Sequence, residues 1–127
     1  MKFKIPFKTP TINLMYSTFR GHRVKSKEAR ELSKDVILIV NSTPYEKIEG
    51  ELEVTINIYS NWFNKDGTIK KRDIANLEKF ITDSIFSGLE DMDDKQIFQI
   101  RMEKFQSDEE FSIIEIKRRC QKENTTE

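Results

Sequence analysis

Cysteine is scarce in this chain of 127 residues, with Cys120 as its single representative. One thiol excludes an intramolecular disulfide and a zinc site built from several thiolates. A long apolar run is also missing, because the longest, Val36 to Val40, is far shorter than the roughly 20 residues that cross a bilayer. The first residues likewise lack the apolar core of a secretory signal. We therefore expect a cytoplasmic protein without a membrane segment.

An excess of charge is absent as well, because 22 Lys and Arg residues balance 22 Asp and Glu residues. The overall charge therefore does not point to a polyanionic partner. The distribution is uneven, however: residues 1–27 hold seven cations and no acid, whereas acids gather at Glu90, Asp91, Asp93 and Asp94. One molecule thus offers a surface for phosphate and a surface for cations. Charge alone equally allows the N-terminal cations to be solvated surface residues.

Apolar periodicity predicts one α/β domain over residues 1–119, followed by a polar tail at 120–127. A chain of this length has one hydrophobic core by default. The patterns predict a small mixed β-sheet with two helices packed on it, in the order β-α-β-α-β-β. The predicted elements are a strand over 2–7, a helix over 26–41, a strand over 52–59, a helix over 73–89, and strands over 97–105 and 110–117.

Three details of this scheme are specific enough to be tested. Residues 9–25 lack a sustained period and are predicted to form a long loop, of a kind that is often functional. The apolar run Val36–Val40 also fits a strand, although the helical period begins before it. The last two strands are predicted to pair as an antiparallel hairpin through residues 106–109.

The predicted helix that starts at Asp73 carries most of the polar chemistry. At about 100° per residue, a helical wheel places Asn76, Lys79 and Asp83 in one sector beside the apolar stripe. Asp73 would stand at the positive end of the helix dipole, which favours its ionised form. These polar groups are therefore expected to overlook a cleft.

A basic run and an acidic pair flank this helix. Lys70, Lys71 and Arg72 precede it, and Asp93 and Asp94 follow it. Mg²⁺ takes oxygen ligands from one or two carboxylates and leaves its other positions to water and phosphate oxygens. Carboxylates beside cations therefore point to phosphodiester chemistry.

Each of these residues also has an ordinary structural explanation. Asp73 taken alone is more often a plain helix N-cap. Lys79 and Asp83 fit an exposed i,i+4 ion pair, and the acidic pair at 93–94 fits a turn before a strand. His22 is more often a surface residue than a general base. These explanations do not account for the occurrence of all the groups together beside a basic run.

The same residues carry a resemblance to a known family. The stretch Arg72-Asp-Ile-Ala-Asn-Leu-Glu-Lys-Phe-Ile-Thr-Asp83, followed by Asp93-Asp-Lys-Gln-Ile97, resembles the RusA family of Holliday-junction resolvases. That family's signature is an Asp-x-Asp-Asn-Leu-x-Lys helix start and a later Asp-Asp-x-Gln-Val/Ile. Upstream, Pro10-Thr-Ile-Asn-Leu-Met-Tyr16 with Arg20 and Arg23 is similar to the family's Pro-x-x-Asn-x-x-Tyr stretch and basic loop. The resemblance covers roughly residues 3 to 118.

The resemblance implies a homodimeric, Mg²⁺-dependent endodeoxyribonuclease that binds four-way DNA junctions and nicks two strands symmetrically. It implies catalytic roles for Asp73, Lys79 and Asp94, and supporting roles for Asn76 and Asp83. Asp93 is a further candidate metal ligand beside Asp73 and Asp94. The residues expected to contact DNA are Arg20, Arg23, Lys25, Lys70, Lys71 and Arg72.

In the expected mechanism, Asp73 and Asp94 bring Mg²⁺ to the scissile phosphate. Lys79 offsets charge on the phosphate oxygens. The cations hold backbone phosphates, which supply affinity with little sequence information. Phe19 is a candidate to wedge between bases at the crossover, and a core position for it is at least as plausible. A C2 dimer matches the near two-fold symmetry of a junction.

One position departs from the family pattern. Ala75 stands where the second aspartate of Asp-x-Asp is expected, which removes a carboxylate usually assigned to metal binding. The number of metal ions is therefore open. A catalytically weak or inactive junction-binding protein of the same fold is one alternative. An unrelated small α/β interaction module, in which the helix at Asp73 is only capped and solvated, is another.

Overall fold

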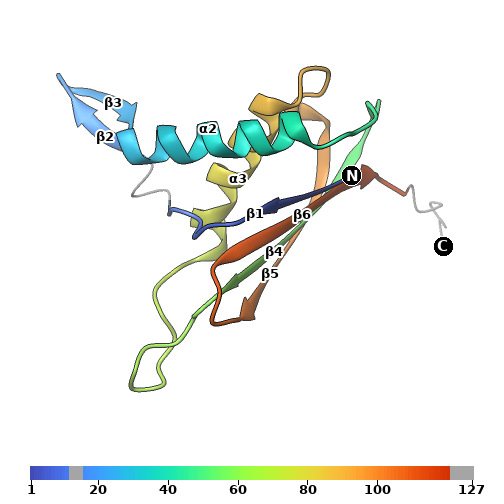
Figure 1. The fold of residues 1–127 in the computed structure, drawn as a ribbon. Helices are drawn as coiled ribbons and strands as arrows, with labels where there is room; N and C mark the ends of the chain where they lie inside the picture. Colours follow the sequence, from blue (N-terminus) through green and yellow to red (C-terminus); the bar gives the residue numbers. More distant parts are fainter. Residues whose placement is uncertain (12–15, 121–127) are drawn as a thin grey trace, which may run out of the picture.

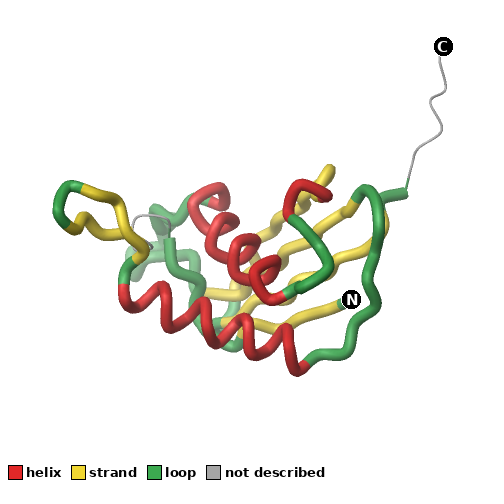
Figure 2. Tube along the Cα trace, turned by 90° about the horizontal axis from the view of Figure 1, so that it is seen from above, coloured by secondary structure: helices red, strands yellow, loops and turns green. Residues whose placement is uncertain are grey.

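The computed structural model describes residues 1–11 and 16–120. For residues 16–19, 22 and 23 it describes the backbone alone. Four strands form one mixed sheet in the order β1-β6-β4-β5. Two helices lie on one face of this sheet (Figure 1, Figure 2). The predicted fold class, a small mixed sheet with two helices, is confirmed. In the described part of the chain, no helix combines the length and apolar character needed to cross a bilayer.

β4 (Leu52–Ser60) is one of the two interior strands and lies between β6 and β5. It runs antiparallel to β6 (Phe111–Arg118) and parallel to β5 (Ile97–Gln106). Parallel neighbours need a long crossover, which α3 (Ile74–Gly88) provides. β1 (Lys2–Ile5) pairs antiparallel with β6 and forms the opposite edge, where Pro6 follows its last residue.

The predicted hairpin over residues 97–117 is wrong, although both of its strands exist. β4 lies between β5 and β6, so the intervening residues carry the chain across the end of β4. There the Ser107 amide donates a hydrogen bond of 2.9 Å to the Ser60 carbonyl. The apolar pattern identifies a strand but not its neighbour in the sheet.

α2 (Lys27–Ser42) begins where it was predicted to begin. The hydroxyl of Ser26 accepts a 3.1 Å hydrogen bond from the Ala29 amide, as an N-cap does. The run Val36–Val40 lies within this helix, so the strand alternative is wrong. A Cβ at Gly88 would lie 3.0 Å from the Cβ of Val40, so a glycine at this position allows α2 and α3 to approach closely.

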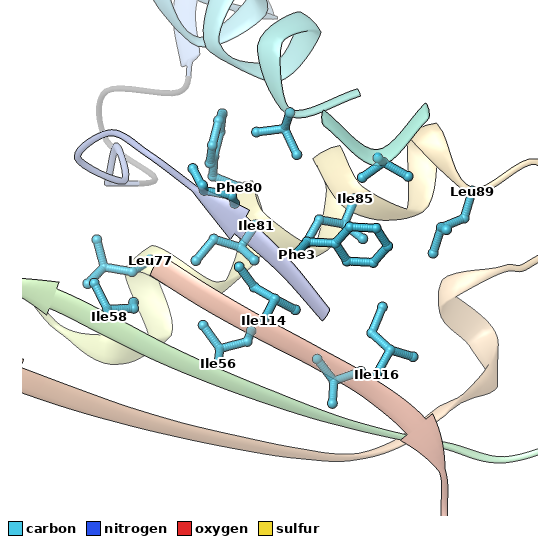
Figure 3. Packing of buried hydrophobic residues seen from close by; sticks show 14 of the residues in the cluster. Phe3, Ile56, Ile58, Leu77, Phe80, Ile81, Ile85, Leu89, Ile114 and Ile116 are labelled. Carbon is cyan, nitrogen blue, oxygen red and sulfur yellow. The ribbon is translucent and has the colours of Figure 1, made fainter. Parts of the chain in front are cut away.

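The hydrophobic core lies between the helices and the sheet. Figure 3 shows the apolar side chains of α3 directed toward those of the sheet. Burying each such side chain contributes about 1.5–3 kcal/mol, so the stripe fixes the rotation of α3 and turns its polar sector away from the core. The core side chains include Leu77, Phe80, Ile81 and Ile85 of α3, Ile56 and Ile58 of β4, and Ile114 and Ile116 of β6.

Residues 16–25 form a hairpin within the segment that was predicted to be a loop. β2 (Tyr16–Phe19) and β3 (His22–Lys25) pair antiparallel and project beyond the start of α2 (Figure 1). Arg20 and Gly21 connect them with φ angles of 51° and 77°. Two successive positive φ angles are typical of a tight two-residue hairpin turn. The loop prediction is therefore wrong for these residues, and 12–15 lie outside the described chain.

Candidate active site

An open pocket of about 380 Å³ lies beside the last turns of α3. It combines three carboxylates with one ammonium group, and carboxylate oxygens are the ligands that hard divalent cations prefer. The pocket is formed by α3, the loop after it, the short 3₁₀ helix η1 (Asp94–Gln96), and the end of β3. Its lining residues are Lys25, Asp83, Phe86, Ser87, Met92, Asp93 and Asp94.

Lys79 and Asp83 form an ion pair along α3 at the edge of this pocket. The Lys79 Nζ and an Asp83 carboxylate oxygen are 3.2 Å apart, and the two side chains are 44% and 34% exposed. The i,i+4 ion pair considered from the sequence is thus present. A pair this exposed contributes only about 0.3–0.5 kcal/mol to stability. Its chemical consequence is that an ammonium group is held next to a pocket carboxylate.

Asp93, in the loop after α3, is the N-cap of η1. Its carboxylate accepts a 2.9 Å hydrogen bond from the Lys95 amide, and the Gln96 side chain accepts one of 2.8 Å from the Asp93 amide. The bond from Lys95 lowers the pKa of Asp93, and a side-chain hydrogen bond with Asp94 lowers it further. Asp93 therefore acts as the turn residue that the sequence allowed. It also lines the pocket.

Gln96 ties η1 to the loop before β4. Its side-chain amide donates hydrogen bonds of 3.1 Å to the carbonyls of Ile48 and Gly50. Asp94, the first residue of η1, is exposed beside the pocket. The glutamine of the Asp-Asp-x-Gln stretch thus has a positional role: it fixes η1, and with it the acidic pair, against the body of the domain.

Asp73 lies at the other end of α3. It occupies the N-cap position and is exposed, but its side chain makes no capping hydrogen bond. The Asn76 amide instead donates to the Asp73 backbone carbonyl at 3.0 Å. The carboxylate of Asp73 therefore stands at the positive end of the helix without satisfying an amide of its first turn.

Arg72, which precedes Asp73, is anchored in the domain. Its guanidinium donates a 2.7 Å hydrogen bond to the Ser60 hydroxyl, a 3.5 Å bond to the Thr9 carbonyl, and lies 4.6 Å from the ring centre of Trp62. Burial lowers the pKa of Arg72, and the negative charge of Glu110 opposes that shift. These contacts occupy the side chain that the sequence assigned to DNA.

Arg72, Ser60, Thr9 and Trp62 together form an anchor at the start of α3. Trp62 is the member of this anchor that was not predicted from the sequence. It is 4% exposed, its indole N–H donates a 2.9 Å hydrogen bond to the Phe105 carbonyl, and the Lys104 ammonium lies 4.7 Å from its ring centre. Its only sequence signal is a single tryptophan in an otherwise polar connection. The anchor joins the residues just before α3 to the ends of β4 and β5.

The two ends of α3 are too far apart to share a ligand within one chain. Ten residues separate Asp73 from Asp83, which corresponds to about 15 Å along the helix axis. Asp93 and Asp94 lie at the Asp83 end. Among the residues that the structure describes, no group of three or more His, Cys, Asp or Glu side chains is close enough to hold a metal ion.

The predicted DNA-contacting residues also divide between the two ends. Lys25 lines the pocket, and Arg20 is exposed in the hairpin turn. Lys71 is exposed just before α3, and Lys70 is half-buried, with its amide bonded to the Trp62 carbonyl. The side chains of Arg23, His22 and Phe19 lie outside the described part of the structure.

Comparison with known proteins places this geometry in a family. The model of the family described as Endodeoxyribonuclease RusA matches residues 6–117 of the chain. This range contains the hairpin, both ends of α3, and η1. No curated protein matches the chain. Because the family model covers most of the 127 residues, the chain belongs to the RusA family of endodeoxyribonucleases.

Proposed function

We propose that this chain is a Mg²⁺-dependent endodeoxyribonuclease that resolves four-way DNA junctions in recombination and repair. The observation that carries the proposal is the family match across residues 6–117, which includes the pocket with Asp83, Asp93 and Asp94. The products would be paired nicks made by a homodimer in the cytoplasm. The family itself supports the nuclease class, and the finer points rest on the arguments below.

The neighbouring carboxylates at the carboxyl end of α3 are the donors that we assign to a magnesium ion, which needs only one or two carboxylate ligands from a protein. Asp94 and Asp93 would hold the ion, with Asp83 beside them, because all three offer carboxylate oxygens to one open pocket. The hydrogen bond from the Lys95 amide lowers the pKa of Asp93, which favours the ionised form of this carboxylate. When bound, the ion supplies Lewis-acid stabilisation of a phosphoryl oxygen and lowers the pKa of a nearby water. Lys79 holds its ammonium group at the same edge, where it would offset charge on the phosphate.

Asp73 is proposed to act with Asp94 of a second copy. The two residues lie at opposite ends of α3 within one chain, so an ion held by both would take its ligands from two chains. Asn76, in the first turn of α3, would stand beside Asp73. This arrangement would make the metal site depend on dimer formation, and a C2 dimer would contain two such sites.

The proposed DNA surface follows the exposed cations. Lys71 and Lys70 at one end of α3, and Lys25, Arg20 and Arg23 at the other, would contact backbone phosphates. Arg72 would act indirectly in this scheme, since its guanidinium is already bound to Ser60. Binding should weaken steeply as salt rises, because phosphate contacts release counterions. A flat salt response would contradict the assignment of these cations.

A second candidate function is junction binding with weak or absent cleavage. The observation that favours it is Ala75, which is exposed on the first turn of α3 at the position of a family carboxylate. Removal of one ligand lowers metal affinity without removing the DNA surface. Binding of a synthetic junction without cleavage in Mg²⁺ or Mn²⁺ would support this candidate.

The direct test is incubation of the protein with a synthetic four-way junction and Mg²⁺. Asp94→Asn and Asp73→Asn should each lower the cleavage rate by about 100-fold or more, because each removes a carboxylate from the proposed site. Asp35→Asn, which changes an exposed acid on α2, is the matched control and should cut normally. Equal cleavage by the unmodified protein and both site variants would show that the site is elsewhere.

A further inference from the structure

Residues 61–71 fold into a small hairpin, called the arm below, between β4 and α3. Backbone hydrogen bonds of 2.7 Å and 2.8 Å join its two sides, and between them an antiparallel bridge pairs Phe63 with Ile69. The arm projects beyond the end of β4 (Figure 1). It leads directly into the start of α3, where Asp73 stands. A projection next to a proposed active site is a candidate for contact with the substrate.

Two apolar side chains share the outward face of the arm. Phe63 and Ile69 form a non-hydrogen-bonded pair, in which opposed side chains lie closest together on one face. The residues on either side of the pair, Trp62 and Lys70, point to the opposite face, and Trp62 is only 4% exposed. Phe63 and Ile69 are 44% and 69% exposed. The arm thus holds an aromatic ring and a branched aliphatic chain side by side in solvent.

The tip of the arm is fixed by its own hydrogen bonds. The chain turns at Gly67, which has a φ angle of 85°. The Asp66 carboxylate accepts hydrogen bonds of 3.0 Å from the Thr68 amide and 2.6 Å from the Thr68 hydroxyl. The Asn64 side-chain amide donates one of 3.1 Å to the same hydroxyl. The turn therefore keeps the two sides of the arm in register.

The base of the arm is fixed to the end of β5. The Gln106 side chain accepts a 3.0 Å hydrogen bond from the Trp62 amide and donates one of 3.0 Å to the Asn61 side-chain oxygen. That oxygen also accepts a 3.1 Å bond from the Phe63 amide. Because the arm is ordered before it meets a ligand, burial of its side chains loses little conformational entropy.

We propose that the arm inserts Phe63 and Ile69 between bases at the crossover of a four-way DNA junction. The inference rests on the proposed function, which supplies the ligand. Apolar side chains that enter a base step unstack the bases and kink the duplex, and an aromatic ring can stack on a base that has lost its neighbour. Insertion costs least where bases are already unpaired or poorly stacked. The crossover of a junction is such a place.

The charges around the apolar pair fit a nucleic acid. Lys65 at the tip and Lys71 at the base of the arm are exposed, so a cation lies on each side of the pair along the chain. Such cations contact backbone phosphates while the apolar pair meets the bases. A protein partner fits less well, because a stable protein interface covers about 800 Å² on each side, far more than two side chains present.

The arm also sets a fixed spacing between the crossover and Asp73. Asp73 follows Ile69 by four positions, which span at most about 14 Å. The Arg72 amide donates a 2.9 Å hydrogen bond to the Lys70 carbonyl, and the Arg72 guanidinium is bonded to Ser60, so this segment is held in place. The arm would therefore determine which phosphate near the crossover reaches Asp73.

A junction with 2-aminopurine at the crossover reports the insertion, because this base fluoresces more strongly when it is unstacked. Divalent ions are left out, so cleavage does not contribute. The unmodified protein should raise the fluorescence, and Phe63→Ala should remove most of the rise and weaken junction binding about 10-fold. Ile69→Ala should have a smaller effect in the same direction. Binding to an intact duplex of the same sequence should change less than about twofold, since no base there is free to stack.

Two further variants separate insertion from a general loss of structure. Phe63→Trp keeps a ring on the arm and should retain the fluorescence rise. Leu38→Ala removes a 63% exposed apolar side chain from α2 and should leave binding and fluorescence unchanged. Circular dichroism should show the same fold in every variant, because each changed side chain is exposed.

Three outcomes would overturn the inference. The first is no fluorescence rise with the unmodified protein, and the second is an equal rise with Phe63→Ala and Ile69→Ala. The third is altered sedimentation of F63A/I69A with unchanged fluorescence, which would mean that the arm contacts protein. A protein that cuts junctions without arm-dependent unstacking would overturn only this inference. One that unstacks the crossover as expected but does not cut in Mg²⁺ would overturn only the nuclease proposal.

Discussion

The two ends of α3 differ in how their polar residues are used. At the amino end, Arg72 is enclosed by Trp62, Ser60 and Thr9, and serves the scaffold. At the carboxyl end, Asp83 and the acidic pair that follows face an open pocket. The amino end is thus tied to the rest of the domain, whereas the carboxyl end is open to solvent and ligands. Adjacent residues of one signature, such as Arg72 and Asp73, can therefore have separate physical roles.

The largest effect is expected when the rigid end is broken at its centre. Trp62→Ala should lower the free energy of unfolding by about 3–5 kcal/mol, because it removes a buried indole and leaves a cavity. The Phe105 carbonyl would also lose its donor. Urea unfolding followed by circular dichroism measures the change. A loss below about 1 kcal/mol would mean that the anchor does not stabilise the domain.

A smaller loss is expected from the guanidinium itself. Arg72→Met keeps an unbranched apolar chain but removes the charged hydrogen bond to Ser60, which should cost about 1.5–3 kcal/mol of unfolding free energy. The matched control is Lys71→Met, an exposed neighbour, which should change stability by less than about 0.5 kcal/mol. Equal effects of the two variants would return Arg72 to the status of a plain surface cation.

The open end should respond in the opposite way, with loss of activity and little loss of stability. Lys79→Met removes an exposed ion pair and should change the unfolding free energy by only about 0.3–0.5 kcal/mol. It should lower junction cleavage by about 10- to 100-fold, because the positive charge at the phosphate is lost. Measured together, unfolding and cleavage would separate the two ends. A Lys79→Met protein that cuts normally would remove Lys79 from the proposed mechanism.

The smallest effect concerns acid. The pKa of Asp93 is lower in the folded chain than its ordinary value. Its cap therefore stabilises η1 above the unfolded pKa of about 3.9, and this contribution is lost as pH falls through the folded pKa. Hydrogen exchange at the Lys95 amide should become faster as pH falls below about 4, after correction for intrinsic exchange. Asp93→Asn should abolish this pH dependence, and an unchanged response in the variant would contradict the assignment.

The sequence predicted the elements with the strongest periodicity. The helix that contains the run Val36–Val40 was recognised because its apolar stripe is continuous and begins after a capping residue. The strand at 52–59 was recognised because its apolar and polar residues alternate. The position of Asp73 at the start of a helix followed from the same pattern. Local patterns are sufficient for such elements, since their signals lie within a few turns or pairs of residues.

Contacts between distant parts of the chain were not predicted, because the two residues of each contact lie far apart in the sequence. Arg72 meets Thr9 across 63 positions, and nothing local to Arg72 indicates that contact. The place of β4 between β5 and β6 likewise depends on competition between strands. The turn at Arg20–Gly21 was missed because its sequence differs from the common Asn-Gly turn. The separation of Asp73 from Asp94 could not be predicted, because the spacing of these residues does not give the direction of the chain after α3.

The proposed nuclease requires a divalent ion at the carboxyl end of α3. Its most direct test is titration of ¹⁵N-labelled protein with Mn²⁺, which broadens amide signals near the bound ion. We expect early broadening at Asp83, Ser87 and Asp94, and loss of that broadening in Asp94→Asn but not in Asp35→Asn. In the dimer, the amides of Asp73 and Asn76 should broaden in the same titration. Absence of site-selective broadening at Asp83 and Asp94 would show that no divalent ion binds in this pocket.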